Sequence, residues 1–424
     1  MPLMRSWVVS ANAAETDFPL NNLPHGVFSA PGRRHHLGIA IGAMILDVTA
    51  AAPVLAPALR GALPDGAADP LAGPDWNAFM AAGPAVWAAF RAALQTMLAE
   101  GAAAREALAP HLVQMSEARL HLPFTVAEYT DFYAGRQHAF NVGTMFRGPE
   151  NALPPNWLHI PIGYNGRAST VVVSGTDIRR PLGQTKAADA DAPTFGPSRR
   201  LDIELEMGAI VGTPSAMGSP VTVAEAAQMI FGYVLLNDWS ARDIQAWEYQ
   251  PLGPFQAKAF GTTISPWIVS RLALAPFAVG APPREKPLLP YLRDDGPGHY
   301  DIALSVEMAG ASGPSATISR TNARELYYSA AQQLAHHASS GCAMRTGDLL
   351  GSGTISGPTR ESYGSLLEMT WGGRDPIELP GGARRTFIED GDTLTLKGHA
   401  EGDGYRIGFG ECRGTIRPAP DVPS

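Results

Sequence analysis

Cysteine is scarce in this chain, and its scarcity excludes two classes of protein. Two cysteines, Cys342 and Cys412, occur among 424 residues and stand far apart in sequence. They match neither the spacing of a zinc or redox motif nor the cysteine density of a disulfide-stabilised secreted domain. We therefore expect a protein of the reducing cytoplasm.

Basic blocks and long hydrophobic runs are missing as well. Charged residues make up 17% of the chain and the formal net charge is −8. Because nucleic-acid binding needs concentrated Lys and Arg, we expect no nucleic-acid partner. The longest apolar stretch, residues 38–46, is too short to span a membrane, and the first residues lack the apolar length of a secretory signal. We expect a soluble protein with no membrane partner.

Glycine and proline are plentiful, at 45 and 37 residues, which favours many short strands joined by tight turns. The length exceeds one ordinary core, so we expect two domains, residues 1–120 and 121–424. In the first domain, apolar stretches flanking Gly42-Ala43 predict a hairpin over residues 37–48. The stretch 76–108, rich in Ala, Leu and Met, predicts one or two helices that cover this sheet.

The first candidate functional feature is a group of carboxylates. Residues 201–207 alternate so strictly that a strand would point three acidic side chains to one face. Asp238 follows a continuous apolar run, 229–236, that is typical of a buried strand. The alternatives are an edge strand with a solvated acidic face and, for Asp238, a helix N-cap. If four carboxylates converge, their repulsion requires a cation or protons, and a hard, oxygen-seeking metal is the natural occupant. The four are Asp131, Glu204, Glu206 and Asp238.

A second feature suits acid–base chemistry. His138 ends the stretch 131–138, which also contains a carboxylate and a phenol. Glu368 lies among large apolar residues in the strand-like stretch 366–371, where burying a carboxylate is costly unless a partner such as an imidazolium is present. A histidine takes up a proton near neutral pH, so His138 suits a general base. The alternative is a structural histidine.

A third feature suits the binding of negative charge. A cation, an amide and a phenol share one face of a predicted helix, at i, i+3 and i+7. Lys258 and Thr262 follow in loop-like sequence, and the glycine-rich stretch 351–358 can bring backbone N–H groups close to an anion. That stretch lacks the Gly-Lys-Ser/Thr ending of a phosphate loop. The alternatives are an exposed polar helix face, a solvated lysine and a plain hairpin turn. The three helical residues are Arg242, Gln245 and Tyr249.

The order and spacing of these motifs resemble the fumarylacetoacetase family over nearly the whole chain. Such long, ordered matches are specific, and matches at both ends extend beyond the catalytic core of the wider superfamily. The matching stretches are residues 18–24, 26–28, 131–139, 236–245, 351–358 and 402–410.

The resemblance implies a mainly β protein with some helix. Its N-terminal domain would be an SH3-like β-barrel, its C-terminal domain a mixed β-sandwich roll that contains the site, and its assembly a homodimer. The family's calcium ligands would be Asp131, Glu204, Glu206 and Asp238, and its second, magnesium position would be held by Asp238, Lys258 and Thr262.

The resemblance also assigns roles in catalysis. His138 would be the general base, oriented by Glu368. The residues that stabilise oxyanion charge would be Arg242, Gln245 and Lys258. The substrate contacts would be Tyr133, Arg147, Tyr164, Gln245, Tyr249 and Thr354.

The implied activity is metal-dependent hydrolysis of fumarylacetoacetate, a dicarboxylate diketone, to fumarate and acetoacetate, the last step of tyrosine and phenylalanine catabolism. The closest alternative activity is that of an acylpyruvate-type hydrolase or decarboxylase of the same superfamily, which would share the metal carboxylates. A non-catalytic metal-binding scaffold would need neither His138 nor Glu368. All-oxygen ligands admit calcium, magnesium or manganese, so the sequence leaves the ion open.

Overall fold

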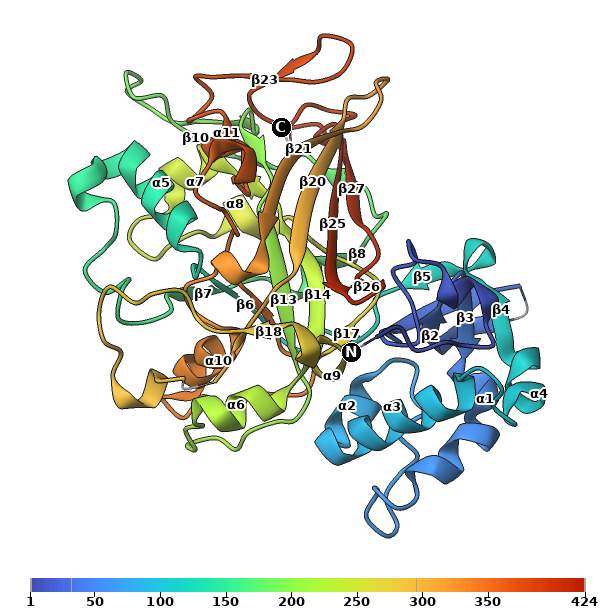
Figure 1. Ribbon diagram of the computed structural model, residues 1–424. Coiled ribbons are helices and arrows are strands. Elements are labelled where there is room, and N and C mark those ends of the chain that lie inside the picture. Colours follow the sequence, from blue (N-terminus) through green and yellow to red (C-terminus); the bar gives the residue numbers. More distant parts are fainter. Residues whose placement is uncertain (1, 32, 295, 423–424) are drawn as a thin grey trace.

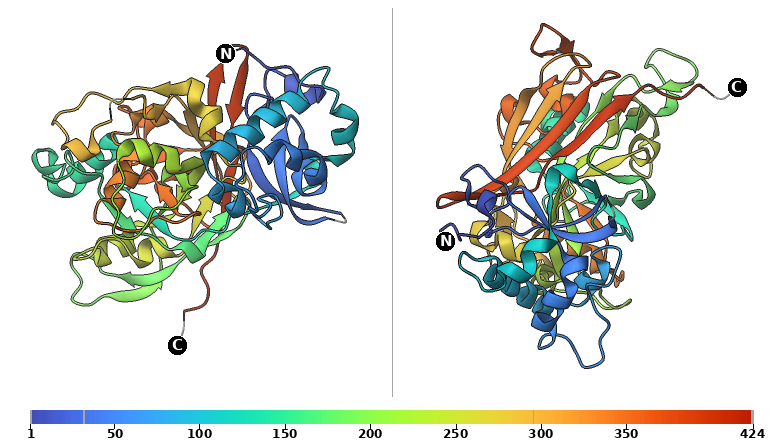
Figure 2. Two further views of the ribbon diagram at one scale, coloured as in Figure 1. Left: turned by 90° about the horizontal axis from the view of Figure 1, so that it is seen from below. Right: turned by 90° about the vertical axis from the view of Figure 1, so that its right-hand side faces the viewer.

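The structure, a computed structural model, describes residues 2–31, 33–294 and 296–422 (Figure 1). A small N-terminal part, drawn in blue in Figure 2, lies on one side of a larger body built around two sheets. The division of the chain at residue 120 stays a prediction. Strand β5 (Arg119–His121) spans that position and pairs with β1 of the N-terminal sheet.

The N-terminal sheet is antiparallel, with the strand order β4-β3-β2-β1-β5. The hairpin expected over residues 37–48 is confirmed as β2 and β3, and its turn contains Gly42 with a φ of +58°, a conformation that favours glycine. Closure of this sheet into an SH3-like barrel stays a prediction. The strands are β1 (His25–Ala30), β2 (Arg33–Ile41), β3 (Met44–Asp47), β4 (Leu112–Gln114) and β5.

Helices pack against this sheet as expected, but residues 76–108 form three of them, not one or two. Gly83 has a φ of +89° and Pro84 follows it as the first residue of α3, so the sequence breaks there and restarts a helix. No helix among the described residues is long and apolar enough to cross a membrane. The N-terminal helices are α1 (Val48–Leu55), α2 (Asn77–Ala81), α3 (Pro84–Leu98) and α4 (Arg105–Leu108).

The main sheet of the larger body positions the site. Its order is β7-β6-β22-β13-β14-β16-β8, with β17 also paired to β14. The buried strand expected over residues 229–236 is confirmed as β14, every residue of which is buried. The strands are β6 (Tyr129–Phe132), β7 (Gly163–Asn165), β8 (Val171–Val173), β13 (Leu205–Val211), β14 (Ile230–Asp238), β16 (Thr262–Ile264), β17 (Val269–Ser270) and β22 (Leu349–Gly351).

A second sheet packs beside the first, in the order β21-β20-β25-β27-β9, with β26 paired to β25 (Figure 1). Its strands are β9 (Ile178–Arg179), β20 (Ala303–Ala309), β21 (Ala316–Asn322), β25 (Thr393–Gly402), β26 (Tyr405–Gly408) and β27 (Cys412–Arg417). Short two-stranded pairs complete the strands: β10 (Leu182–Thr185) with β11 (Thr194–Pro197), β12 (Leu201–Asp202) with β15 (Ser240–Ala241), β18 (Ala278–Val279) with β19 (His299–Tyr300), and β23 (Ile377–Glu378) with β24 (Arg384–Arg385). The helices of this body are α5 (Arg136–Arg147), α6 (Val223–Met229), α7 (Arg242–Glu248), α8 (Gln256–Ala259), α9 (Arg271–Leu274), α10 (Ala330–Ala338) and α11 (Leu366–Met369).

The two parts share one apolar core, and His25 lies inside it. Its backbone exchanges two hydrogen bonds with Ile268, and its ring packs against Trp76 and Phe231, at centroid distances of 4.6 and 5.0 Å. Burial, and secondarily the charge of Arg91, lowers the pKa of His25 from 6.5 to about 3. A proton on this ring would place a charge in an apolar contact between the two parts.

Acidification should therefore destabilise the protein through His25. His25 binds a proton near pH 6.5 in the unfolded chain and only near pH 3 in the folded chain. The contribution of neutral His25 to the free energy of unfolding is therefore complete above about pH 6.5 and is lost as the pH falls. At about pH 5 the expected loss is ~2 kcal/mol. Urea unfolding of the wild type and His25→Phe at about pH 7.5 and about pH 5 measures it. The same pH dependence in both proteins would contradict the assignment.

Candidate active site and metal centre

Four buried carboxylates converge at one end of the main sheet. One oxygen from each lies within 4.8 Å of the others. Asp131 lies on β6, Glu206 on β13 and Asp238 at the end of β14, while Glu204 occupies a break between β12 and β13. The continuous strand expected over residues 201–207 is thus wrong, because residues 203 and 204 leave the ladder. The alternative of a solvated acidic edge is also wrong, since no carboxylate of the four is more than 5% exposed.

Gly351 makes room for this cluster. It lies on β22, between β6 and β13, and is paired with Asp131 and Gly208. A Cβ at this position would lie 2.8 Å from Asp131 Oδ1 and 2.9 Å from Glu206 Oε2, so any larger residue would fill the space between the carboxylates. Asp131 Oδ1 and Glu206 Oε1 are buried and lack a hydrogen-bond partner among the described residues. Unpartnered, convergent carboxylate oxygens fit a hard divalent cation.

Electrostatics divides the four carboxylates into two kinds. Burial raises the pKa of Glu206 and of Asp131, and the charges of Asp238 and Glu204 raise both further. Burial would also raise the pKa of Glu204, but the charges of Lys258 and Arg242 lower it to about 2. Asp238 has a raised pKa because of burial, which Lys258 opposes. The Asp131–Glu206 side of the cluster therefore has the larger deficit of positive charge.

Two buried cations, Lys258 and Arg242, contact the Glu204–Asp238 side of the cluster. Lys258 Nζ donates to Asp238 Oδ2 at 2.7 Å and also to Glu204. Arg242 Nη1 lies 2.8 Å from Glu204 Oε1 and donates to Gln245 Oε1 at 3.2 Å. The solvated lysine considered from the sequence is wrong, since Lys258 is 7% exposed on α8. The ammonium is a donor only, so within a cation site Lys258 has just its main-chain oxygen to offer.

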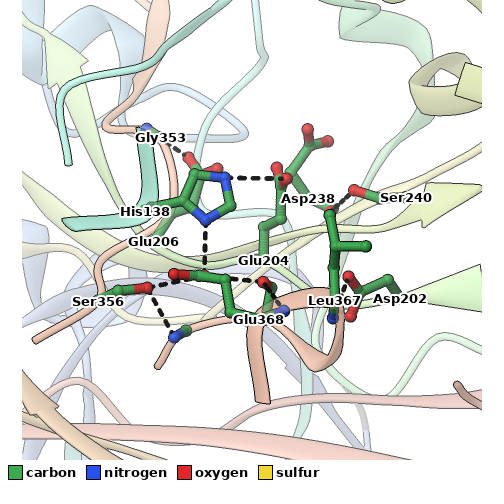
Figure 3. Close-up of polar contacts among 12 residues, drawn as sticks. His138, Asp202, Glu204, Glu206, Asp238, Ser240, Gly353, Ser356, Leu367 and Glu368 are labelled. Carbon is green, nitrogen blue, oxygen red and sulfur yellow. Dashed lines mark hydrogen bonds and ion pairs between the residues drawn. The ribbon is translucent and has the colours of Figure 1, made fainter. Parts of the chain in front are cut away.

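His138 and Glu368 form a buried pair beside the carboxylates (Figure 3). His138 Nδ1 lies 2.6 Å from Glu368 Oε2, and its Nε2 lies 3.9 Å from Glu204 Oε1. Burial alone would raise the pKa of Glu368, but His138 and hydrogen bonds from its neighbours lower it. An ionised carboxylate only accepts hydrogen bonds, so Nδ1 carries the proton and the Nε2 lone pair of neutral His138 faces away from Glu368.

Glu368 is held by residues that the sequence reasoning missed. Asn141 Nδ2 donates to its Oε1 at 2.8 Å, and Ser356 Oγ and Ser365 Oγ donate to its Oε2 at 2.9 and 2.8 Å. The strand expected over residues 366–371 is wrong, because Glu368 lies on helix α11. A local signal was present: Ser365 caps this helix, and Ser-x-x-Glu is a capping-box pattern.

A cavity of about 620 Å³ opens onto the cluster and onto His138. Beyond its polar end, α5 and the loop after α7 contribute apolar side chains, among them Phe146 and Leu252. Eleven of the fifteen predicted site residues line it: Asp131, Tyr133, His138, Arg147, Tyr164, Glu204, Arg242, Gln245, Tyr249, Lys258 and Thr354. The other four, Glu206, Asp238, Thr262 and Glu368, lie behind this lining and are buried.

The remaining predicted residues take definite positions. Tyr164 Oη and Thr262 Oγ1 donate to the two oxygens of Asp238, both at 3.1 Å. The N-cap alternative for Asp238 is wrong, because the N-cap of α7 is Ala241. Gly353 N–H donates to Glu206 Oε2 at 2.9 Å, so the anion that the glycine-rich stretch meets is a carboxylate of the protein itself. Thr354 Oγ1 is buried without a partner in the described part of the chain.

Comparison with known families decides where this chain belongs. A family model described as "Fumarylacetoacetate (FAA) hydrolase C-terminal" matches residues 128–417, and one described as "Fumarylacetoacetase N-terminal" matches residues 21–123. The chain belongs to the fumarylacetoacetase family. Both matches lie where the fold places the larger body and the N-terminal part, so the family resemblance of the sequence is confirmed.

Curated fumarylacetoacetases are similar to this chain along nearly its whole length. The protein from Bos taurus is 50% identical over 413 residues, which covers 96% of this chain and 98% of that protein. The Homo sapiens protein is 49% identical with the same coverage. The Arabidopsis thaliana protein is 46% identical and covers 99% of this chain and 100% of its own length.

Solved structures confirm the fold class, mainly β with some helix. Fumarylacetoacetate hydrolase (EaFAH) from psychrophilic Exiguobacterium antarcticum superposes with a TM-score of 0.53 at 15% identity, covering 93% of this chain and 99% of that one. Cg1458 with inhibitor gives a TM-score of 0.52 at 12% identity, covering 94% and 100%. At such low identity these likenesses concern the fold alone.

Proposed function

We propose that this protein hydrolyses the carbon–carbon bond of fumarylacetoacetate and releases fumarate and acetoacetate. The observation that carries the proposal is one cavity that holds both a buried histidine–carboxylate pair and four convergent carboxylates. The curated relatives named fumarylacetoacetase, at up to 50% identity over nearly full length, support this substrate.

His138 is proposed to activate water. Its Nδ1 is engaged by Glu368, which leaves Nε2 as the proton acceptor on the side of the cavity. As Nε2 takes the proton of an attacking water, the ring becomes positively charged, and the ionised Glu368 stabilises that charge. Asn141 and the two serines hold Glu368 in place, so the imidazole keeps its orientation.

Arg242, Gln245 and Lys258 are proposed to stabilise the oxyanion that forms at the attacked carbonyl. Arg242 Nη2 is buried and has no partner among the described residues, so it is a free donor beside the cavity. A well-placed donor of this kind typically contributes about 3 to 4 kcal/mol to the transition state. The orphaned Thr354 hydroxyl is a second free group, which supports a substrate contact there.

The carboxylate cluster is proposed to hold calcium, with magnesium at the position of Asp238, Thr262 and the main-chain oxygen of Lys258. When bound, a divalent cation supplies Lewis-acid polarisation of the diketone oxygens and disperses the negative charge of the departing enolate. The chain's own residues bind the rest of the substrate. The proposed contacts to it are Tyr133, Arg147, Tyr164, Gln245, Tyr249 and Thr354, all of which line the cavity.

The assembly is proposed to be a homodimer in the cytoplasm. The scarcity of cysteine supports the compartment. Light scattering of the purified protein should give twice the mass of one chain across the working concentration range, because obligate interfaces are large. A single-chain mass at every concentration would refute this assembly.

A direct assay tests the proposed function. Purified protein with added calcium or magnesium should deplete the ultraviolet absorbance of fumarylacetoacetate, which is lost when the conjugated diketone is cleaved. Acylpyruvates should be the comparison substrates. Turnover of acylpyruvates with none of fumarylacetoacetate would assign the protein to another activity of the superfamily, and turnover of neither would point to a binding role.

A further inference from the structure

Asp202 is a buried carboxylate outside the cavity lining that accepts hydrogen bonds from two separate parts of the site. Arg242 Nε donates to its Oδ2 at 2.8 Å. The backbone N–H of Leu366 donates to Oδ1 at 2.7 Å, and that of Leu367 donates to Oδ2 at 3.0 Å. A fourth bond, of 2.8 Å, comes from its neighbour Ile203. All four partners are N–H donors, so the two oxygens of Asp202 act only as hydrogen-bond acceptors.

The partners of Asp202 belong to the elements that hold two catalytic groups of the proposed reaction, the His138–Glu368 pair and the Arg242 guanidinium. Leu366 and Leu367 are the first two residues of α11, the helix that bears Glu368 and through it orients His138. Arg242 opens α7 and contacts Glu204. One side chain on β12 thus connects α11, the helix that bears Glu368, to the Arg242 guanidinium on α7, although α7 and α11 lie more than a hundred residues apart in sequence. Figure 3 shows Leu367 and Asp202 side by side, to the right of Glu368.

We propose that Asp202 is a positioning residue that fixes the distance between the His138–Glu368 pair and Arg242. The inference rests on the proposed function, because it assigns Asp202 a part in that reaction. Asp202 does not line the cavity, so it acts through its partners. The base must reach the water while the guanidinium reaches the oxyanion, and a misplacement of about 1 Å can cost a hundredfold in rate.

Asp202→Asn is the informative substitution. It keeps the shape but replaces one acceptor oxygen by an NH₂ group, which would face N–H donors. We expect kcat to fall about 10- to 100-fold while KM changes less than about threefold, the range for residues that orient catalytic groups.

Asp392→Asn is the matched control. Asp392 is also fully buried and also accepts from an arginine, Arg385, at 2.8 and 3.0 Å, and from a backbone N–H, that of Glu389, at 2.8 Å. It does not line the cavity. This variant should lose thermal stability as well, yet keep kcat within about twofold of the wild type.

A double-mutant cycle separates positioning from general destabilisation. If Asp202 acts through Glu368, then Asp202→Asn combined with Glu368→Gln should reduce kcat by clearly less than the product of the two single effects. Multiplicative effects would overturn the proposal, because they mean that the two residues act independently.

Hydrogen exchange gives a test that does not require an Asp202 variant to fold. Arg242→Lys keeps a positive charge but loses the Nε donor to Asp202. If the carboxylate couples the two elements, the amides of Leu366 and Leu367 should exchange faster in this variant, although Arg242 does not bond to them. Unchanged exchange there would overturn the coupling.

The outcomes also distinguish the inference from the function on which it rests. A wild-type protein without turnover would overturn both. An active wild type whose Asp202→Asn variant keeps normal kcat, or loses only what Asp392→Asn loses, would overturn the role of Asp202 and leave the hydrolase assignment intact.

Discussion

Removal of divalent cations should abolish turnover of fumarylacetoacetate, and return of calcium or magnesium should restore it. Lys258 and Arg242 offset the charge of Glu204, and Lys258 that of Asp238, whereas Asp131 and Glu206 have no such contact within the described part of the chain, and only Glu204 of the four has a lowered pKa. Without a cation the Asp131–Glu206 side keeps protons, so the substrate oxygens would meet carboxyl groups in place of a Lewis acid. Activity before and after exhaustive chelation, with metal content verified, measures the effect.

Glu206→Gln tests the same claim by substitution. Glu206 has no cationic partner among the described residues, so its amide variant disturbs the cation site without releasing Lys258 or Arg242, as Glu204→Ala would. Added calcium should raise the unfolding temperature of the wild type and of Asp392→Asn, but not that of Glu206→Gln. Full activity after verified metal loss would contradict the metal assignment.

His138→Ala should reduce the rate by about 10² to 10⁴, the usual range for loss of a general base. Its Nε2 is the ring nitrogen that Glu368 leaves free, and no other histidine lines the cavity in the described part of the chain. Cation-dependent stabilisation should be unchanged, because His138 is not one of the four clustered carboxylates. Steady-state kinetics and the calcium-induced shift in unfolding temperature separate chemistry from binding.

His399→Ala is a suitable control, since His399 also lies beside a carboxylate, Glu401 at 3.3 Å, but away from the cavity lining. It should leave the rate unchanged. Glu368→Gln should lower the rate with little effect on binding, because the amide stabilises the protonated ring less well than the carboxylate does. Near-normal turnover by His138→Ala would make the imidazole structural and require another source of the nucleophile.

Local sequence pattern was a good guide to single elements of this fold. The Gly42 turn and the apolar run of β14 follow from residues close in sequence, and both are confirmed. The break at residues 203–204 was not predictable, because perfect alternation favours an unbroken strand. The helical start at Ser365 was readable as a capping pattern, but large apolar residues after it suggested a strand.

Burial of charge was the main limit of the sequence reasoning. Lys258 and Glu204 each look solvated when taken alone, and they are buried because they pair with each other across 54 positions of sequence. Asp202 was visible only as the first of three acidic residues in an alternating stretch. Its partners come from two other segments, so no local pattern shows that its carboxylate is enclosed by donors. The assembled family motifs supplied the long-range information that single patterns lack.

The most direct test of the central claim is product analysis in ¹⁸O-labelled water. If His138 activates water against the ketone carbonyl of the fumaryl group, cation-loaded protein should form fumarate and acetoacetate in equal amounts, with one labelled oxygen in a carboxylate of the fumarate. Substrate loss that yields carbon dioxide, unequal products, or fumarate without the label would contradict hydrolysis of the carbon–carbon bond at this site.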